Sequence, residues 1–172
     1  MSEHMGVRVE LWVVAADAGG IWLVSGSDAL RTARIDADSF IQSEMELLAH
    51  EHFPGVHLDV THSTSWRQSG PAMFTTYVAI ARPPEFVQDR WPDALPLTTE
   101  LLAEVGKPFP HAPNGAPLPR RVDVLMHAVR HLRFLRDFDA PTSAAMDDNW
   151  KRHLESFEPA LACMFDEPYL AA

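Results

Sequence analysis

Two apolar runs near the start of the chain predict a β-hairpin. Residues 7–15 and 21–24 are rich in β-branched and aromatic side chains, which is typical of strands. The turn sequence Asp-Ala-Gly-Gly at 17–20 separates them. Pairing around this turn places Val9, Leu11, Val13, Trp22 and Val24 on one face, and Trp12, Val14, Ile21 and Leu23 on the other. Because both faces are apolar, we expect the sheet to be covered on both sides.

A helical pattern follows this hairpin. A polar loop over 25–37 leads to a helix predicted over 38–53, with Asp36 or Asp38 available as its N-cap. The pair Pro-Gly at 54–55 is expected to end the helix.

Strand patterns return after this break. Apolar and polar residues alternate over 56–66, which predicts a half-buried strand. A turn at 68–71 then leads to a further strand over 72–81. The fold class that we expect is α/β (α+β), a mixed β-sheet sandwiched between helices.

The last third of the chain is predicted to be helical. Residues 83–118 are irregular and proline-rich, with one short helix expected over 98–106. Two long helices are predicted over 119–138 and about 142–165. The connection of three residues between them favours an antiparallel helical hairpin.

Length and composition favour one globular domain. The chain has 172 residues, of which 47% are hydrophobic and 22% charged, and this composition argues against extensive disorder. We therefore expect a single domain over 1–172. It comprises a sheet and helix core over 7–82, an irregular connection over 83–118 and the helical hairpin over 119–168.

Charge and cysteine content narrow the setting. No apolar stretch reaches the roughly 20 residues that span a bilayer, and no signal peptide is evident. The single cysteine, Cys163, cannot form an intramolecular disulfide, so we expect a cytoplasmic protein. A net charge of -10 disfavours binding to duplex nucleic acid. Twelve of the fourteen basic residues are arginine, which fits a high-GC bacterial gene.

The helix over 38–53 holds the most informative polar residues. Steps of about 100° per residue gather one broad apolar arc. Its members are Phe40, Ile41, Met45, Leu47 and Leu48. Glu44 and Glu51 fall inside this arc, where two aligned carboxylates resemble a platform for a divalent metal. Alternatively, both lie at the edge of the arc and reach water or an arginine.

Histidines lie close to these carboxylates along the chain, at positions 50, 52, 57 and 62. Glu46 and His50 are four residues apart and could share one ligand. The candidate metal ligands are therefore Glu44, His50 and Glu51, and the candidate catalytic residues are Glu51 and Glu46. No HExxH or other zinc spacing is present, so a surface histidine cluster is the alternative. His52 points toward the apolar arc, as a core histidine would.

A second row of polar residues occurs on the helix over 119–138. Asp123, His127 and His131 follow one another at four-residue steps. Such a row could hold a metal or position a proton donor. It could equally be the solvated edge of an amphipathic helix.

The order hairpin, loop, acidic helix, Pro-Gly break, strand, turn, strand over residues 7–82 resembles the central part of the Nudix hydrolases. In that family the helix ends in Arg-Glu-hydrophobic-x-Glu-Glu-x-Gly, and its glutamates bind magnesium. The closest register places Glu51 at the last glutamate and His50 at the one before it. Glu46 then stands in the place of the arginine and Leu47 in the place of the first glutamate.

Other positions also depart from the Nudix pattern. Thr32 and Asp38 occupy the upstream glycine and glutamate positions, and the closing glycine is displaced to Gly55. The resemblance implies an α/β/α fold with at most one or two surviving metal ligands. It does not cover the C-terminal helices.

Three functions follow from these patterns. The leading hypothesis is a Nudix-like domain with a degraded catalytic motif that acts as a ligand-binding or regulatory module. Its partner would be a nucleotide-like small molecule or another protein. The first alternative is a hydrolase of nucleoside diphosphate compounds that uses Mg or Mn with an atypical ligand set. The second is a structural protein that forms a homo-dimer through its helical hairpin.

Overall fold

The computed structural model describes residues 6–26, 29–31, 35, 40–69, 72–83, 85–99 and 121–161. The chain divides into two compact units, Met1–Pro96 and Leu97–Ala172. The first unit holds most of the sheet, and the second unit holds the C-terminal helices. The expected single domain over 1–172 stays a prediction.

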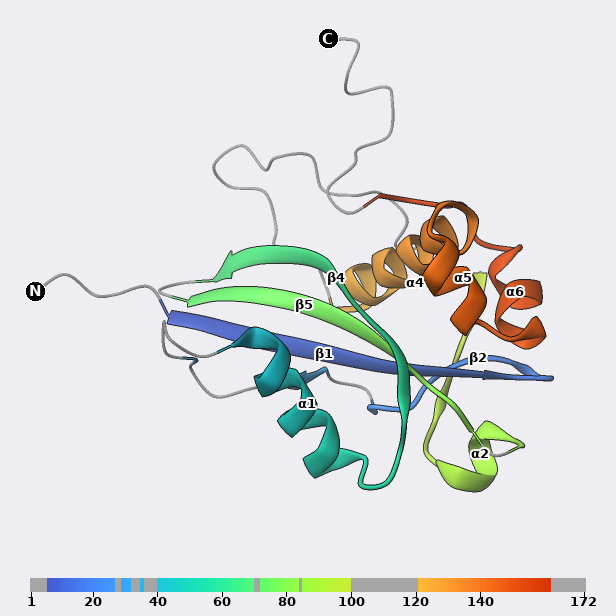
Figure 1. Cartoon of the computed structure of the whole chain (residues 1–172), viewed down its shortest axis with the longest axis horizontal. Helices are drawn as coiled ribbons and strands as arrows, with labels where there is room; N and C mark the ends of the chain where they lie inside the picture. The colour runs from blue at the N-terminus through green and yellow to red at the C-terminus, as the bar shows by residue number, and fades with distance from the viewer. Residues whose placement is uncertain are drawn as a thin grey trace, which may run out of the picture. The chain divides into compact units, whose positions relative to one another are not determined.

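A mixed six-stranded β-sheet organises the first unit (Figure 1). The strand order is β4-β5-β1-β2-β6, and β3 pairs with β1 off this path. The strands are β1 (Gly6–Asp17), β2 (Gly20–Leu23), β3 (Leu30–Arg31), β4 (Leu58–Ser69), β5 (Ala72–Ala81) and β6 (Leu95–Leu97). Strand β1 runs antiparallel to β2 and β3 but parallel to β5. Together with the helices, this sheet confirms the predicted α+β class.

The β1–β2 hairpin has the predicted faces. Val14 pairs with Leu23 and Ala15 with Trp22, so alternate residues of the two strands share a face. Both faces of β1 are buried, which confirms the expectation from its continuous apolar run. One of these faces packs against the helix α1 (Ile41–His52). The buried core there comprises Leu11, Val13, Ala15, Leu48, Ala49, Phe53, Ala79 and Ala81.

Helix α1 ends where the sequence predicts but begins differently. Phe53 N–H bonds back to the carbonyl of Ala49, and Gly55 then adopts a positive φ of 73°. The helix stops before Pro54 because the residue that precedes a proline avoids the α region, and Phe53 has φ -129° and ψ 61°. Glycine at position 55 then tolerates the left-handed conformation of the turn. The predicted N-cap is wrong. Phe40 occupies the cap position without a side-chain hydrogen bond, and Asp36 and Asp38 lie outside the described residues.

The β4–β5 hairpin follows the predicted strands, 56–66 and 72–81. Strand β5 has the predicted bounds, whereas β4 begins two residues later and extends to Ser69. The register shifts between Leu58 and Val60 and again between Ser63 and Ser65. These shifts are β-bulges, which redirect side chains along the strand.

Three short elements were not predicted. Strand β3 lies within the expected polar loop, where Ile35 also forms an isolated bridge with Val7. The helix α2 (Val87–Arg90) and strand β6 lie within the region that was expected to be irregular. The helix predicted over 98–106 falls almost entirely outside the described residues.

The second unit contains the first predicted long helix. This is α4 (Arg121–Phe138). Its buried stripe is the predicted one: Val124, Leu125, Ala128, Val129, Leu132 and Leu135. No helix within the described ranges is long and apolar enough to cross a membrane.

The prediction of a second long helix over about 142–165 is wrong. Residues 140–154 form two short helices, α5 (Ala140–Ala145) and α6 (Asp148–Leu154). The carboxylate of Asp139 accepts the Thr142 N–H at the start of α5, and that of Asp147 accepts the Trp150 N–H at the start of α6. Because Asp147 is an N-cap, a new helix begins immediately after it. The residues that follow α6, up to 161, are not helical.

Candidate functional site on helix α1

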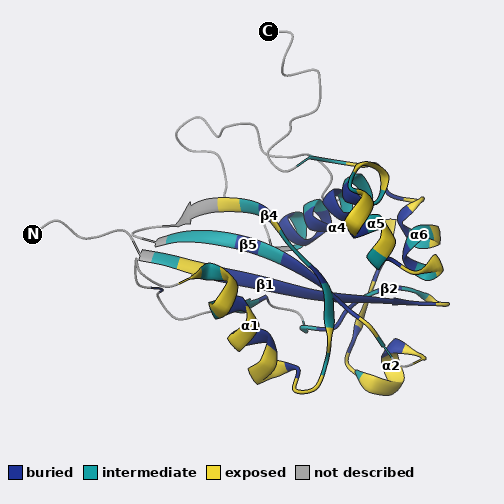
Figure 2. Ribbon diagram, in the orientation of Figure 1, coloured by how far each residue is buried: buried dark blue, intermediate teal, exposed yellow. Residues whose placement is uncertain are grey.

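Helix α1 carries the four leading candidate residues, Glu44, Glu46, His50 and Glu51. Its buried side consists of Met45, Leu48 and Ala49. Glu44 is half-buried, whereas the side chains of Glu46, His50 and Glu51 are exposed. Figure 2 shows this division between a buried inner side and an exposed outer side of α1.

The proposed site residues occupy two opposite flanks of the helix. At about 100° per residue, Glu44 and Glu51 lie on one flank of the buried side. Glu46 and His50 lie on the other flank, where Gln42 Nε2 donates a hydrogen bond of 3.0 Å to Glu46 Oε1. Carboxylates on opposite flanks point away from one another, so the four residues do not form one platform.

The expected apolar arc of α1 is too wide. Phe40 is 80% exposed and Leu47 is 64% exposed, although both were predicted to lie in the core. His52, predicted to be a core histidine, is also exposed. A helix that rests on one layer of sheet buries only the residues directly above the strands. Here that narrow stripe is centred on Met45, and it leaves both flanks to solvent.

The structure does not bring the predicted metal ligands together. Among the described residues, no group of three or more His, Cys, Asp or Glu side chains could hold a metal ion. Glu44, His50 and Glu51 are all described, so they do not form such a group. The row Asp123, His127 and His131 on α4 does not form one either.

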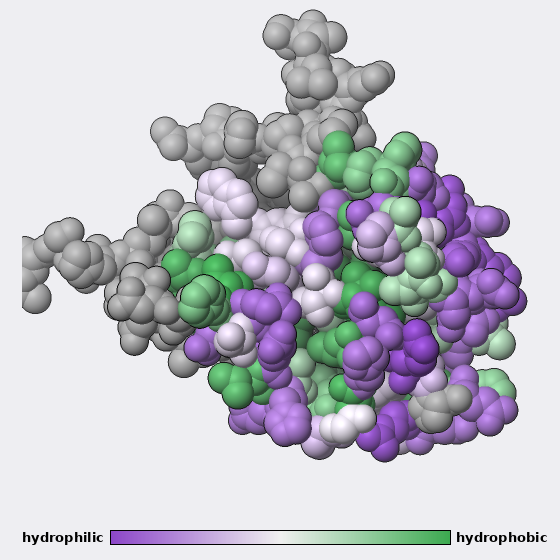
Figure 3. Space-filling model, in the orientation of Figure 1, coloured by the Kyte–Doolittle hydropathy of each residue, from purple (hydrophilic) through white to green (hydrophobic). Residues whose placement is uncertain are grey.

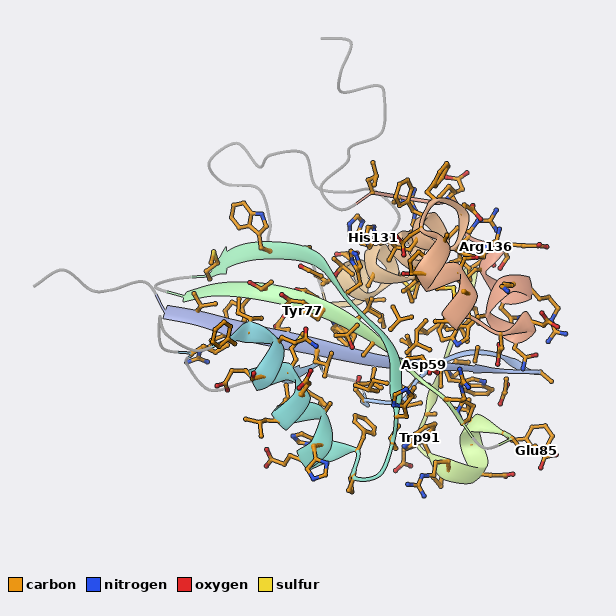
Figure 4. The ribbon with its side chains drawn as sticks, viewed as in Figure 1. Asp59, Tyr77, Glu85, Trp91, His131 and Arg136 are labelled. Carbon is orange, nitrogen blue, oxygen red and sulfur yellow. The ribbon has the colours of Figure 1, made fainter. Side chains whose placement is uncertain are left out.

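His131 has a packing role on α4. Its side chain is buried, and its Nδ1 atom lies 3.2 Å from the carbonyl oxygen of Ala160. Its ring stacks on Phe134 with 6.0 Å between ring centroids. Figure 4 labels His131 on this helix. Contacts of this kind are those of a core histidine whose ring is held in place.

Asp59 is a polar residue that the sequence patterns did not single out. Its carboxylate lies 2.9 Å from Arg82 Nε and 3.4 Å from His57 Nε2, and its side chain is only 10% exposed. Asp59 lies at the first register shift of β4, between Leu58 and Val60 (Figure 4). In the sequence, the only sign of this ion pair was that Asp59 is a polar residue within an alternating strand. Both partners are largely exposed, so this arrangement is a surface ion pair.

Asp17 forms a buried polar centre between the first hairpin and α2. Its carboxylate accepts hydrogen bonds from the backbone N–H groups of Gly19, Gly20 and Val87 and from Trp22 Nε1. Burial raises the pKa of this carboxyl, but the donors at Val87, Trp22 and the turn lower it by more. The net pKa is below its ordinary value, so Asp17 is a negatively charged anchor at neutral pH.

A second buried polar group lies on the face of β1 that is turned away from α1. Glu10 is buried, and Thr76 Oγ1 donates to its Oε2 atom over 3.4 Å. On the same face, the buried Trp12 Nε1 atom has no hydrogen-bond partner among the residues that the structure describes. Neither residue was predicted to contribute a buried polar group, because each lies within an apolar strand.

Comparison with known proteins adds no family assignment. No protein-family model matches the chain, and no curated protein shows significant sequence similarity to it.

Proposed function

We propose that the chain is a Nudix-like domain with a degraded catalytic motif that acts as a ligand-binding or regulatory interaction module. The element order supports this proposal. The β1–β2 hairpin precedes α1, and the β4–β5 hairpin follows it. This is the order on which the resemblance rests. One cysteine and an arginine-biased composition fit a bacterial, cytoplasmic module.

The single observation that favours binding over hydrolysis is the placement of the acidic residues on α1. Metal-assisted attack on a diphosphate needs several oxygen ligands that converge on one ion. Glu44 and Glu51 share one flank of the helix, whereas Glu46 and His50 share the other. Leu47, at the position of the first Nudix glutamate, is an exposed apolar residue that cannot bind a cation. The same surface is well suited to contact another molecule.

Calorimetry with a panel of nucleoside diphosphates and dinucleotides, with and without Mn²⁺, tests this proposal. A parallel assay would follow release of phosphate or nucleoside monophosphate. We expect binding of one ligand class, or capture of a defined protein partner, without turnover. If neither a ligand nor a protein partner binds, the proposal fails.

The same assay detects the hydrolase alternative. If the wild type shows Mn²⁺-dependent turnover and Glu51→Gln abolishes it, the function of this domain is hydrolysis and not binding alone. Glu85→Gln is the matched control, because it removes the same charge from an exposed position outside α1. Equal loss in both variants would indicate a general charge effect.

A further inference from the structure

One flank of α1 combines two exposed apolar side chains with two acidic side chains in a regular row. Phe40, Glu44, Leu47 and Glu51 follow one another at steps of four, three and four residues. This spacing aligns side chains along one side of a helix. We call these four residues the α1 stripe. Phe40 immediately precedes the first residue of the helix.

The apolar members of the α1 stripe are unusually open to solvent. Phe40 and Leu47 are two of the most exposed large hydrophobic residues among those described. Single exposed apolar side chains are common, but two that are aligned on one helix flank form a contact surface. Figure 3 shows apolar and polar surface alternating where α1 lies. Amphipathic helices bind partners through apolar anchors at positions such as i and i+7, and Phe40 and Leu47 have this spacing.

Charge determines which kind of partner fits this surface. Residues 40–53 contain three glutamates and no lysine or arginine, in a chain of net charge -10. Covering Glu44 and Glu51 without a counter-charge would be costly. A second copy of the chain would bring two more carboxylates to the interface and no cation from its own stripe. The complementary surface must therefore carry lysine or arginine beside apolar residues.

We propose that the α1 stripe docks a basic amphipathic helix of another protein. Apolar side chains of that helix pack on Phe40 and Leu47, and its cations lie beside Glu44 and Glu51. This inference rests on the proposed function as an interaction module, and it names the surface and the chemistry of the partner.

A labelled synthetic helix of leucine and lysine serves as the probe, with its leucine and glutamate counterpart as the negative peptide. Fluorescence anisotropy measures binding to the full chain. We expect the lysine peptide to bind and the glutamate peptide not to bind. The double variant Glu44→Gln/Glu51→Gln should weaken binding by about tenfold or more. Phe40→Ser/Leu47→Ser should weaken it to a similar extent.

The control variant Glu46→Gln/Glu85→Gln removes the same two charges from exposed positions outside the stripe. We expect it to change affinity by less than about twofold. Equal losses in the two charge variants would overturn the inference, because attraction would then depend on net charge alone. Circular dichroism before and after heating verifies that each variant is folded.

Two further outcomes separate this inference from the proposed function. If wild-type protein binds nucleotides but not the lysine peptide, the α1 stripe proposal fails and the binding module stands. If light scattering shows a dimer that Phe40→Ser/Leu47→Ser abolishes, the occupant is a second copy and the inference is wrong.

Discussion

The Asp17 carboxylate provides a sharp test of how the first unit is stabilised. In Asp17→Asn, the amide oxygen can keep the bonds to Gly19, Gly20 and Trp22, which all reach one carboxylate oxygen. The amide nitrogen then replaces the oxygen that accepts the Val87 N–H over 2.9 Å. Two donors would face each other at the start of α2. The amide cannot avoid this conflict by rotating, because it would then lose the bonds at the turn.

The cost follows from the hydrogen bonds that are lost. A bond to a charged group contributes about 1.5–3 kcal/mol, and leaving a buried donor unpaired adds to the loss. We therefore expect the free energy of unfolding of Asp17→Asn to be lower than that of the wild type by about 1.5–3 kcal/mol at pH 7. For a chain of this size, that loss lowers Tm by about 3–12 °C. Urea unfolding should show a lower midpoint with an unchanged slope.

The pH dependence gives an independent check. The pKa of Asp17 is lower in the folded state than its ordinary value of 3.8. Its charge therefore stabilises the fold fully above that ordinary value, and this contribution is lost as the pH falls through the folded pKa. The difference between wild type and Asp17→Asn should be constant from pH 7 to about 5 and shrink below pH 4. Equal stability of the two proteins at pH 7, or a difference that persists unchanged to pH 3, would refute this reasoning.

Three further substitutions test local features. Gly55→Ala should cost about 1–2 kcal/mol in thermal unfolding because of its positive φ alone, since an added Cβ meets no atom within 4 Å; an unchanged Tm would contradict this. Asp147→Ala removes the cap of α6 and should cost about 0.5–2 kcal/mol in urea, whereas the neighbouring Asp148→Ala should cost less. Equal effects would argue against capping. Leu132→Ala, at a fully buried position, should cost about 2–5 kcal/mol, and a loss below 1 kcal/mol would show that the α4 core is not tightly packed.

Regular periodicity made much of the fold predictable from sequence. The apolar runs at 7–15 and 21–24 predicted the hairpin and both of its faces, because a strand that is buried on both sides carries apolar residues on each of them. The stripe from Val124 to Leu135 gave α4 in the same way. The α4 stripe needs no knowledge of distant residues, because helix geometry alone aligns it.

Elements that depend on distant partners or local competition could not be predicted. Strand β3 has two residues and exists through its pairing with β1. Met146, Trp150 and Leu154 keep a regular apolar spacing although a helix break lies between Met146 and Trp150. Periodicity alone does not reveal that Asp147 caps a new helix. The site was predicted less well for a related reason. The width of the buried arc on α1 depends on how the helix lies on the sheet, and this decides the exposure of Phe40 and Leu47.

The parallel pairing of β1 with β5 has a consequence for how the protein is made. Glu10 and Thr76 are register partners although 66 positions separate them along the chain. Closing so long a loop is slow, whereas the β4–β5 hairpin joins neighbours across a tight connection. During synthesis, the apolar β1 segment therefore leaves the ribosome well before its partner strand exists. Until residues 72–81 have been synthesised, β1 is an unpaired apolar strand that is prone to aggregation and that chaperones would have to protect.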